Sequence, residues 1–173
     1  MAVVDCAPGR GLPDLPSVPP GAYRLGSGDV VRLITVGDES LTGEFRVGDG
    51  GKVALPLVGG VPAAGRTPDG LAAAIKKALV QGNLYTAPSV SVEVTSYRPI
   101  FVLGEVSKPG QYPYQPGMTV VTAAAVAGGF TYRAINDYAS VVRTQDGAAV
   151  EGKAIRQDFI QPGDVITIFE RRF

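Results

Sequence analysis

A glycine-aspartate pair stands directly before a run of β-branched residues at two widely separated places in this chain. Gly28-Asp29 precedes Val30-Val31, and Gly163-Asp164 precedes Val165-Ile166. Glycine accepts the positive φ that a tight turn requires, and an aspartate side chain can bond nearby amides. β-Branched residues favour an extended backbone. Both pairs therefore predict a structural turn followed by a strand, and their repetition suggests two small modules of related design.

The residue types that are missing exclude several kinds of catalysis. The chain has no histidine and a single cysteine, Cys6. This composition excludes nucleophilic sites with a histidine base, zinc sites that include histidine, and a disulfide within the chain. No Asp-x-Asp-x-Asp pattern indicates a carboxylate metal site. We expect no catalytic residue, no metal and no cofactor.

The charge balance argues against a nucleic acid partner. The 16 lysines and arginines equal the 16 aspartates and glutamates in number, so the net charge is zero. Proteins that bind a phosphate backbone carry clustered positive charge instead. No apolar run approaches the ~20 residues that a membrane-spanning helix needs. The first residues also lack the charged and apolar regions of a signal peptide.

Prolines at positions 8, 13, 16, 19 and 20 dominate the N-terminal region. They predict an extended tether over residues 1–22, with ordered structure from about Tyr23. Cys6 precedes this tether, and a free thiol, a packing residue and a lipid attachment point are its three candidate roles. Val3-Val4-Asp5 is a poor match for the Leu-Ala/Ser-Gly/Ala sequence that normally precedes a lipidated cysteine. We therefore expect acylation of a natural precursor rather than of this chain.

Residues 23–97 combine alternating strand patterns with one marked helix. The turn at residues 48–51 predicts a hairpin between residues 44–47 and 52–55. Pro56 is expected to end that ladder, Leu57 to continue extended, and Gly59-Gly60 to turn the chain again. Thr67 and Pro68 begin the predicted helix, and Gly82 ends it in a left-handed conformation.

Residues 98–173 place a second helix among further strands. Thr119 caps a predicted helix over residues 120–127, which Gly128-Gly129 closes. A strand over residues 138–143 with a turn at 145–147, and a last strand over residues 165–168, complete this half. The sequence therefore predicts an α+β protein of two small modules that resemble the β-grasp fold.

Aromatic side chains are the best candidates for a contact surface. Tyr112 and Tyr114 share one strand face beside a Pro-Gly turn, where they can contact a glycan or a second subunit. The glycine-rich turns lack the Gly-Lys-Ser/Thr ending of a phosphate-binding loop. The adjacent acids Asp38 and Glu39 lie on one loop, whereas a glycosidase needs two acids on converging elements.

The ordered motifs resemble a known family. Residues 23–30, 40–47, 53–59, 65–67 and 88–92 resemble the polysaccharide export domain of bacterial outer-membrane polysaccharide exporters, the OPX or Wza-like family. Residues 102–106, 109–112, 127–130 and 162–166 resemble the soluble-ligand-binding β-grasp (SLBB) domain that follows it. The motif residues to which we assign a structural role are Gly28, Asp29, Pro56, Gly104, Pro109, Gly110, Gly128, Gly129, Gly163 and Asp164.

The resemblance implies a domain order and a function. It implies an N-terminal tether (residues 1–22), a polysaccharide export domain (23–97) and an SLBB domain (98–173). It also implies a ring-forming periplasmic subunit, associated with the outer membrane, that conducts capsular or exopolysaccharide with an inner-membrane copolymerase. Larger members add SLBB repeats and a C-terminal pore helix. This chain ends after its last strand and resembles the short exporters, which need a separate outer-membrane β-barrel.

Two alternatives belong to other functional classes. A monomeric periplasmic carbohydrate-binding module would use the SLBB half alone. A polysaccharide-modifying enzyme would need catalytic side chains, and a chain without histidine or converging acids offers few.

Overall fold

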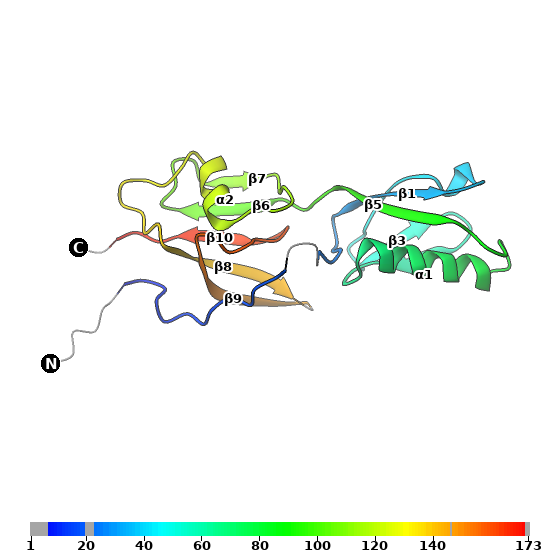
Figure 1. Ribbon diagram of the computed structural model, residues 1–173, viewed down its shortest axis with the longest axis horizontal. Coiled ribbons are helices and arrows are strands. Elements are labelled where there is room, and N and C mark those ends of the chain that lie inside the picture. The colour runs from blue at the N-terminus through cyan, green and yellow to red at the C-terminus, as the bar shows by residue number, and fades with distance from the viewer. Residues whose placement is uncertain (1–6, 20–22, 146, 172–173) are drawn as a thin grey trace. The chain divides into compact units, whose positions relative to one another are not determined.

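The computed structural model describes residues 7–19, 23–145 and 147–171, and it divides into two units (Figure 1). Residues 22–98 form one unit, called the first module. Residues 1–21 together with residues 99–173 form the other, called the second module. Cys6 lies outside the described residues, so its three candidate roles remain predictions.

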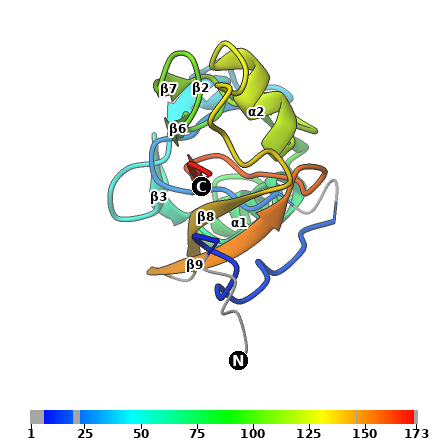
Figure 2. The ribbon, with the colours of Figure 1, turned by 90° about the vertical axis from the view of Figure 1, so that its left-hand side faces the viewer.

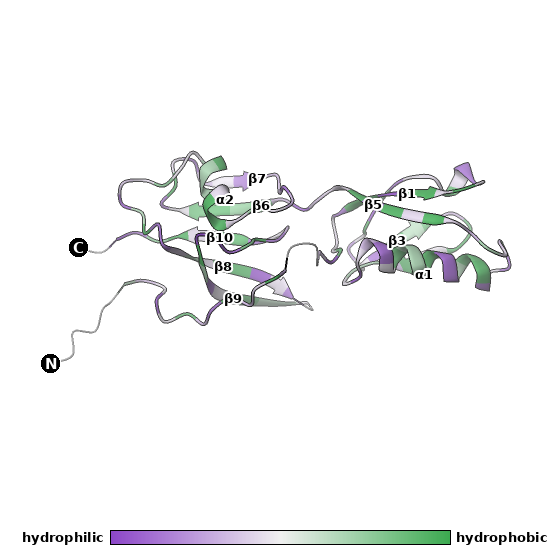
Figure 3. Ribbon diagram, viewed as in Figure 1, coloured by the Kyte–Doolittle hydropathy of each residue, from purple (hydrophilic) through white to green (hydrophobic). Residues whose placement is uncertain are grey.

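Three antiparallel strands form the main sheet of the first module, in the order β2-β1-β5. They are β1 (Val30–Thr35), β2 (Gly43–Arg46) and β5 (Val90–Ser96), with the short 3-10 helix η1 (Glu39–Leu41) between the first two. Every second side chain of β1 is buried, as its period of two predicts. Hydrophobic residues colour much of β1 and β5 in Figure 3.

A separate hairpin of β3 (Lys52–Leu55) and β4 (Gly59–Pro62) completes the strands of this module. The hairpin predicted across residues 48–51 is much shorter than expected, because β2 pairs with β1. The two sides of the turn are joined by the antiparallel bridge Val47–Val53 and by a hydrogen bond from the Gly48 amide to the Lys52 carbonyl at 2.9 Å. Burial decides this pairing, since Val53 and Val61 are register partners that both face the core.

The chain reverses at residues 56–58 rather than at Gly59-Gly60. The Val58 amide donates to the Pro56 carbonyl at 2.9 Å, and Leu57 between them has a φ of 69°. This is a γ-turn of the strained, positive-φ form. The expected extended chain at Leu57 is wrong, because the β3–β4 pairing forces a reversal immediately after Pro56.

Helix α1 (Pro68–Gln81) begins as the sequence predicts. The Thr67 hydroxyl accepts a hydrogen bond from the Gly70 amide at 3.1 Å, and Pro68 occupies the first helical turn. The helix buries one face in the core of the module, formed by Leu71, Ala72, Ile75 and Leu79.

The end of α1 differs from the prediction by one residue. Gly82 has a φ of −77°, so it is not the left-handed residue. Asn83 has a φ of 53°, and the Leu84 amide that follows donates to the Leu79 carbonyl at 3.1 Å. Asparagine tolerates the left-handed conformation better than most residues, so it serves in place of glycine here.

The second module has a five-stranded mixed sheet in the order β7-β6-β10-β8-β9. Its strands are β6 (Ile100–Gly104), β7 (Gly110–Tyr112), β8 (Tyr138–Gln145), β9 (Ala148–Ile155) and β10 (Val165–Ile168). The pair β6–β10 is parallel and the other pairs are antiparallel. The predicted α+β class with two small modules is confirmed.

Helix α2 (Val120–Val126) packs its buried residues into the core of this module, with Ile100, Val102 and Ile166 of the sheet. Gly128 and Gly129 both have positive φ, and the Gly129 amide donates to the Ala124 carbonyl at 2.9 Å. The predicted glycine end of this helix is confirmed.

The described part of the N-terminal region, residues 7–19, lies along the edge strand β9 (Figures 1 and 2). The Leu15 amide donates to the Lys153 carbonyl at 2.8 Å, and the Lys153 amide donates to the Pro13 carbonyl at 2.7 Å. The Leu15 side chain is 8% exposed and belongs to the core. Ordered structure therefore begins before Tyr23, contrary to the prediction.

Residues 7–19 are ordered because the edge strand β9 needs a pairing partner. An uncovered strand edge leaves amides and carbonyls unpaired, and proline between short paired stretches does not prevent pairing at the residues beside it. Composition identifies this segment as extended but does not show which sheet edge it covers.

Replacing Gly152 by valine is expected to detach this N-terminal segment. A Cβ atom at residue 152 would lie 2.8 Å from the Leu15 Cα and 3.0 Å from its backbone nitrogen. Valine suits a strand, so β9 itself is not penalised. We expect faster proteolysis within residues 7–19 and faster hydrogen exchange at Leu15. Gly11→Ala is the control, because nothing lies within 4 Å of a Cβ atom there; equal protease sensitivity of the two variants would contradict the prediction.

Candidate functional site

Asp29 is fully buried and closes the turn that precedes β1. Its carboxylate accepts hydrogen bonds from the Gly26 amide at 2.8 Å, the Arg98 amide at 3.0 Å and the Tyr23 hydroxyl. The Arg98 Nε lies 3.3 Å from the same carboxylate. All of these contacts hold the turn, so the Asp29 carboxylate has no evident role in binding a ligand.

Asp164 repeats this geometry before β10. Its carboxylate accepts from the Gln161 amide at 2.8 Å, three residues earlier, as Asp29 does from Gly26. The Arg143 guanidinium forms a two-pronged contact with it, with Nη2 at 2.7 Å and Nε at 3.0 Å. Both side chains of this pair are almost completely buried. The two glycine-aspartate turns therefore share one construction, with an arginine against each buried carboxylate.

Burial raises the pKa of the Tyr23 hydroxyl well above its usual value, and its hydrogen bond to the Asp29 carboxylate raises it further. The folded state thus favours the neutral phenol, and this stabilisation is present below pH ~10, the unfolded value. It is lost as the pH rises above 10. Unfolding at pH 9 to 11.5 should show a steeper loss of first-module stability in the natural protein than in Tyr23→Phe. Parallel losses in the two proteins would refute this assignment.

The remaining motif residues lie at turns and strand ends. Pro56 begins the γ-turn between β3 and β4. Gly104 ends β6 with a φ of 83°, and a Cβ atom there would lie 2.1 Å from the Ile168 carbonyl oxygen. Pro109 precedes Gly110, the first residue of β7. A structural role for these residues remains our proposal.

Tyr112 and Tyr114 are half-buried and pack against the core of the second module. The Tyr112 hydroxyl donates to the Lys108 carbonyl. Tyr132 is far more open, with 89% of its surface exposed. A glycan or subunit contact by Tyr112 and Tyr114 stays a prediction, and only part of each ring is accessible for it.

A groove of about 520 Å³ runs between β4 and α1, within the first module. Strand β4 supplies Gly60 and Pro62, and α1 supplies Gly70, Ala74 and Lys77. The small side chains keep the two elements from filling the space between them. This volume falls within the range of small-molecule binding sites.

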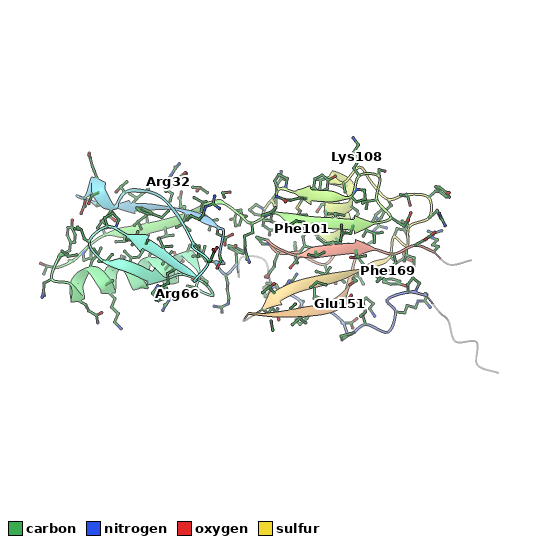
Figure 4. All side chains as sticks on the ribbon, turned by 180° about the vertical axis from the view of Figure 1, so that it is seen from behind. Arg32, Arg66, Phe101, Lys108, Glu151 and Phe169 are labelled. Atoms are coloured by element: carbon green, nitrogen blue, oxygen red, sulfur yellow. The ribbon has the colours of Figure 1, made fainter. Side chains whose placement is uncertain are left out.

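Two cationic side chains line this groove, and no acidic residue does. Arg66, labelled in Figure 4, lies in the segment between β4 and α1, and Lys77 lies on α1. Neither forms an ion pair with any described residue. Lys52 lies outside this lining, although its side chain passes close to Gly60. The groove therefore presents positive charge to whatever enters it.

Sequence reasoning did not find this groove. Arg66 and Lys77 lie on different elements, and their common site depends on how β4 packs against α1. One signal was available: Gly70, Ala74 and Lys77 follow the three- and four-residue spacing of a single helix face.

Two features are absent from the part of the chain that the structure describes. No group of three or more aspartate, glutamate or cysteine side chains lies close enough together to hold a metal ion. None of the helices in the described ranges has both the length and the apolar character needed to cross a membrane.

Comparison with known proteins finds two successive family matches along the chain. Residues 17–95 match the family described as polysaccharide biosynthesis/export protein, and residues 99–153 match the SLBB domain. The chain is also similar to the exopolysaccharide production protein ExoF of Rhizobium meliloti (strain 1021), with 39% identity over 62% of this chain. The match covers 28% of that relative's length. The resemblance predicted from the motifs is confirmed, with the two domains in the predicted order.

Proposed function

Since the chain carries a polysaccharide biosynthesis/export domain followed by an SLBB domain, we propose that it is a subunit of a bacterial polysaccharide export machinery. The ordered pair of domains is the observation that carries this proposal. The similarity to an exopolysaccharide production protein supports it and favours a secreted polymer as the cargo.

In this proposal the protein acts in the periplasm beside the outer membrane. Copies associate head to tail into a closed ring, through which capsular polysaccharide or exopolysaccharide passes. The inner-membrane copolymerase delivers the polymer, and a separate outer-membrane β-barrel completes the conduit. The subunit guides the polymer and does not modify it.

The buried charges of the two modules support a non-catalytic role. Asp29 and Asp164 are the buried carboxylates among the described residues, and an arginine contacts each. A catalytic acid must face a cleft that a substrate can enter. These two aspartates instead hold turns within the core.

Deletion of the gene tests the proposal, with secreted and surface polysaccharide as the readout. We expect extracellular polymer to be lost and restored by the natural gene. Unchanged export in the deletion strain would overturn the proposal. If the purified protein then bound glycans as a monomer, a carbohydrate-binding module would be the better interpretation.

The ring is tested separately. Light scattering and electron microscopy of the purified protein, alone and with its copolymerase, should show a closed assembly of fixed stoichiometry. A strict monomer at high concentration under both conditions would contradict the ring while leaving the role in export open to the genetic test.

A further inference from the structure

We propose that the groove between β4 and α1 binds an acidic segment of the exported polysaccharide through the carboxylates of its sugars. This inference rests on the proposed function and adds the chemical class of the cargo. It also assigns Arg66 and Lys77 as the residues that recognise it.

The charge of the groove selects an anionic ligand. Arg66 and Lys77 line it without an ion-pair partner among the described residues, and no aspartate or glutamate lines it. The chain as a whole has zero net charge, so this local excess is not a consequence of overall composition. A guanidinium matches the planar carboxylate with two parallel hydrogen bonds, and an ammonium adds a point charge.

The openness of the groove and its polar side chains suit a sugar segment. The groove has a volume of about 520 Å³ and an open, largely exposed rim, and its lining mixes polar side chains with glycine, alanine, valine and proline. Gln81, also in the lining, offers an amide that both donates and accepts hydrogen bonds to hydroxyl groups. An exposed site with few cations binds weakly, as a polymer in transit requires.

Weak binding is sufficient if several copies act together. Every subunit of an assembly would present the same groove, and linked sites raise the overall avidity well above that of a single site. Each contact can then break without release of the whole polymer. The groove would thus retain an acidic polymer while it moves.

Binding of defined oligosaccharides to the full chain tests the proposal. The probe is an oligomer of galacturonate, with a dextran oligomer of similar length as the neutral comparison. We expect the galacturonate oligomer to bind, with amide shifts mapped by NMR to β4 and α1, and dextran not to bind. Arg66→Gln/Lys77→Gln should weaken binding by about tenfold or more, since two exposed charge contacts, each accounting for roughly a threefold factor or more, are lost together.

A matched variant controls for overall charge. Lys76→Gln/Arg46→Gln removes one lysine and one arginine from exposed positions that do not line the groove. We expect it to bind galacturonate as the natural protein does. Equal losses in the two double variants, equal binding of dextran, or equally tight binding of polyglutamate or polyphosphate would each overturn the proposal.

Failure of this inference is distinguishable from failure of the proposed function. If gene deletion abolishes export but Arg66→Gln/Lys77→Gln supports it fully, the function stands and the groove is not a cargo site. If deletion leaves export unchanged, the proposed function itself fails.

Discussion

Replacing Arg143 by methionine is expected to destabilise the second module by about 3–5 kcal/mol, because the Asp164 carboxylate would stay buried without its cation. The Arg143 side chain is 2% exposed, and its guanidinium also donates to the Pro16 and Phe159 carbonyls at 3.4 and 3.3 Å. It thus joins β8, the turn before β10 and the N-terminal segment. Methionine fills similar volume but satisfies none of these acceptors.

The measurement should resolve the two modules, since a chain with two units need not unfold in one step. Hydrogen exchange at the amides of β8 and β10 reports the stability of the second module directly. Amides of β1 and β5 in the first module should be unaffected. Unchanged exchange rates in β8 and β10 would show that the buried Arg143–Asp164 pair contributes little to the stability of the second module.

Two further variants separate the buried charge from other effects. Arg133→Met removes an arginine from an ion pair with Glu170, whose side chains are 49% and 44% exposed, so it should cost at most about 1 kcal/mol. Arg143→Met/Asp164→Asn removes both charges while keeping an acceptor for the Gln161 amide. This double variant should be more stable than Arg143→Met alone. A double variant as unstable as the single one would point to lost packing instead.

Replacing Gly104 by alanine is expected to destabilise the same module by roughly 2–4 kcal/mol, from backbone strain and a lost hydrogen bond. The added Cβ atom would lie 2.1 Å from the Ile168 carbonyl oxygen, which accepts a hydrogen bond from the Glu105 amide at 3.0 Å. Because that oxygen belongs to the backbone, the strands β6 and β10 must separate locally to relieve the contact.

Gly117→Ala is the matched control for this prediction. Gly117 lies in the same module with a φ of 82°, but nothing lies within 4 Å of a Cβ atom there. It should show only the conformational cost of a left-handed alanine, about 1–2 kcal/mol. Thermal and denaturant unfolding of both variants would compare them. If Gly104→Ala were no less stable than Gly117→Ala, the close approach of Gly104 to Ile168 would not matter for stability.

Local signals predicted the elements that depend on neighbouring residues alone. Thr67-Pro68 begins α1, and Gly128-Gly129 ends α2, because capping and left-handed glycine act within one turn of helix. The prediction placed the left-handed residue at the end of α1 on Gly82. The residue is Asn83 instead, because asparagine also tolerates that conformation.

Pairing between strands was predicted less well. The turn at residues 48–51 has the composition of a hairpin, yet β2 and β3 belong to different sheets. A turn brings two strands close, but the burial of their apolar faces in the core decides which strands pair. The same holds for residues 7–19, whose composition shows an extended chain and not the edge of β9 that they cover.

The sequence by itself determines the two modules, their helices, the turns that open β1 and β10, and the domain order that points to polysaccharide export. These features depend on short-range backbone preferences and on motifs that can be read along the chain. Only the tertiary structure places Arg143 against Asp164, residues 7–19 on β9, and Arg66 with Lys77 beside one groove. Each of these contacts joins residues that lie far apart along the chain or on separate elements. Burial and the geometry of packing decide which of them come together, and local sequence does not encode this.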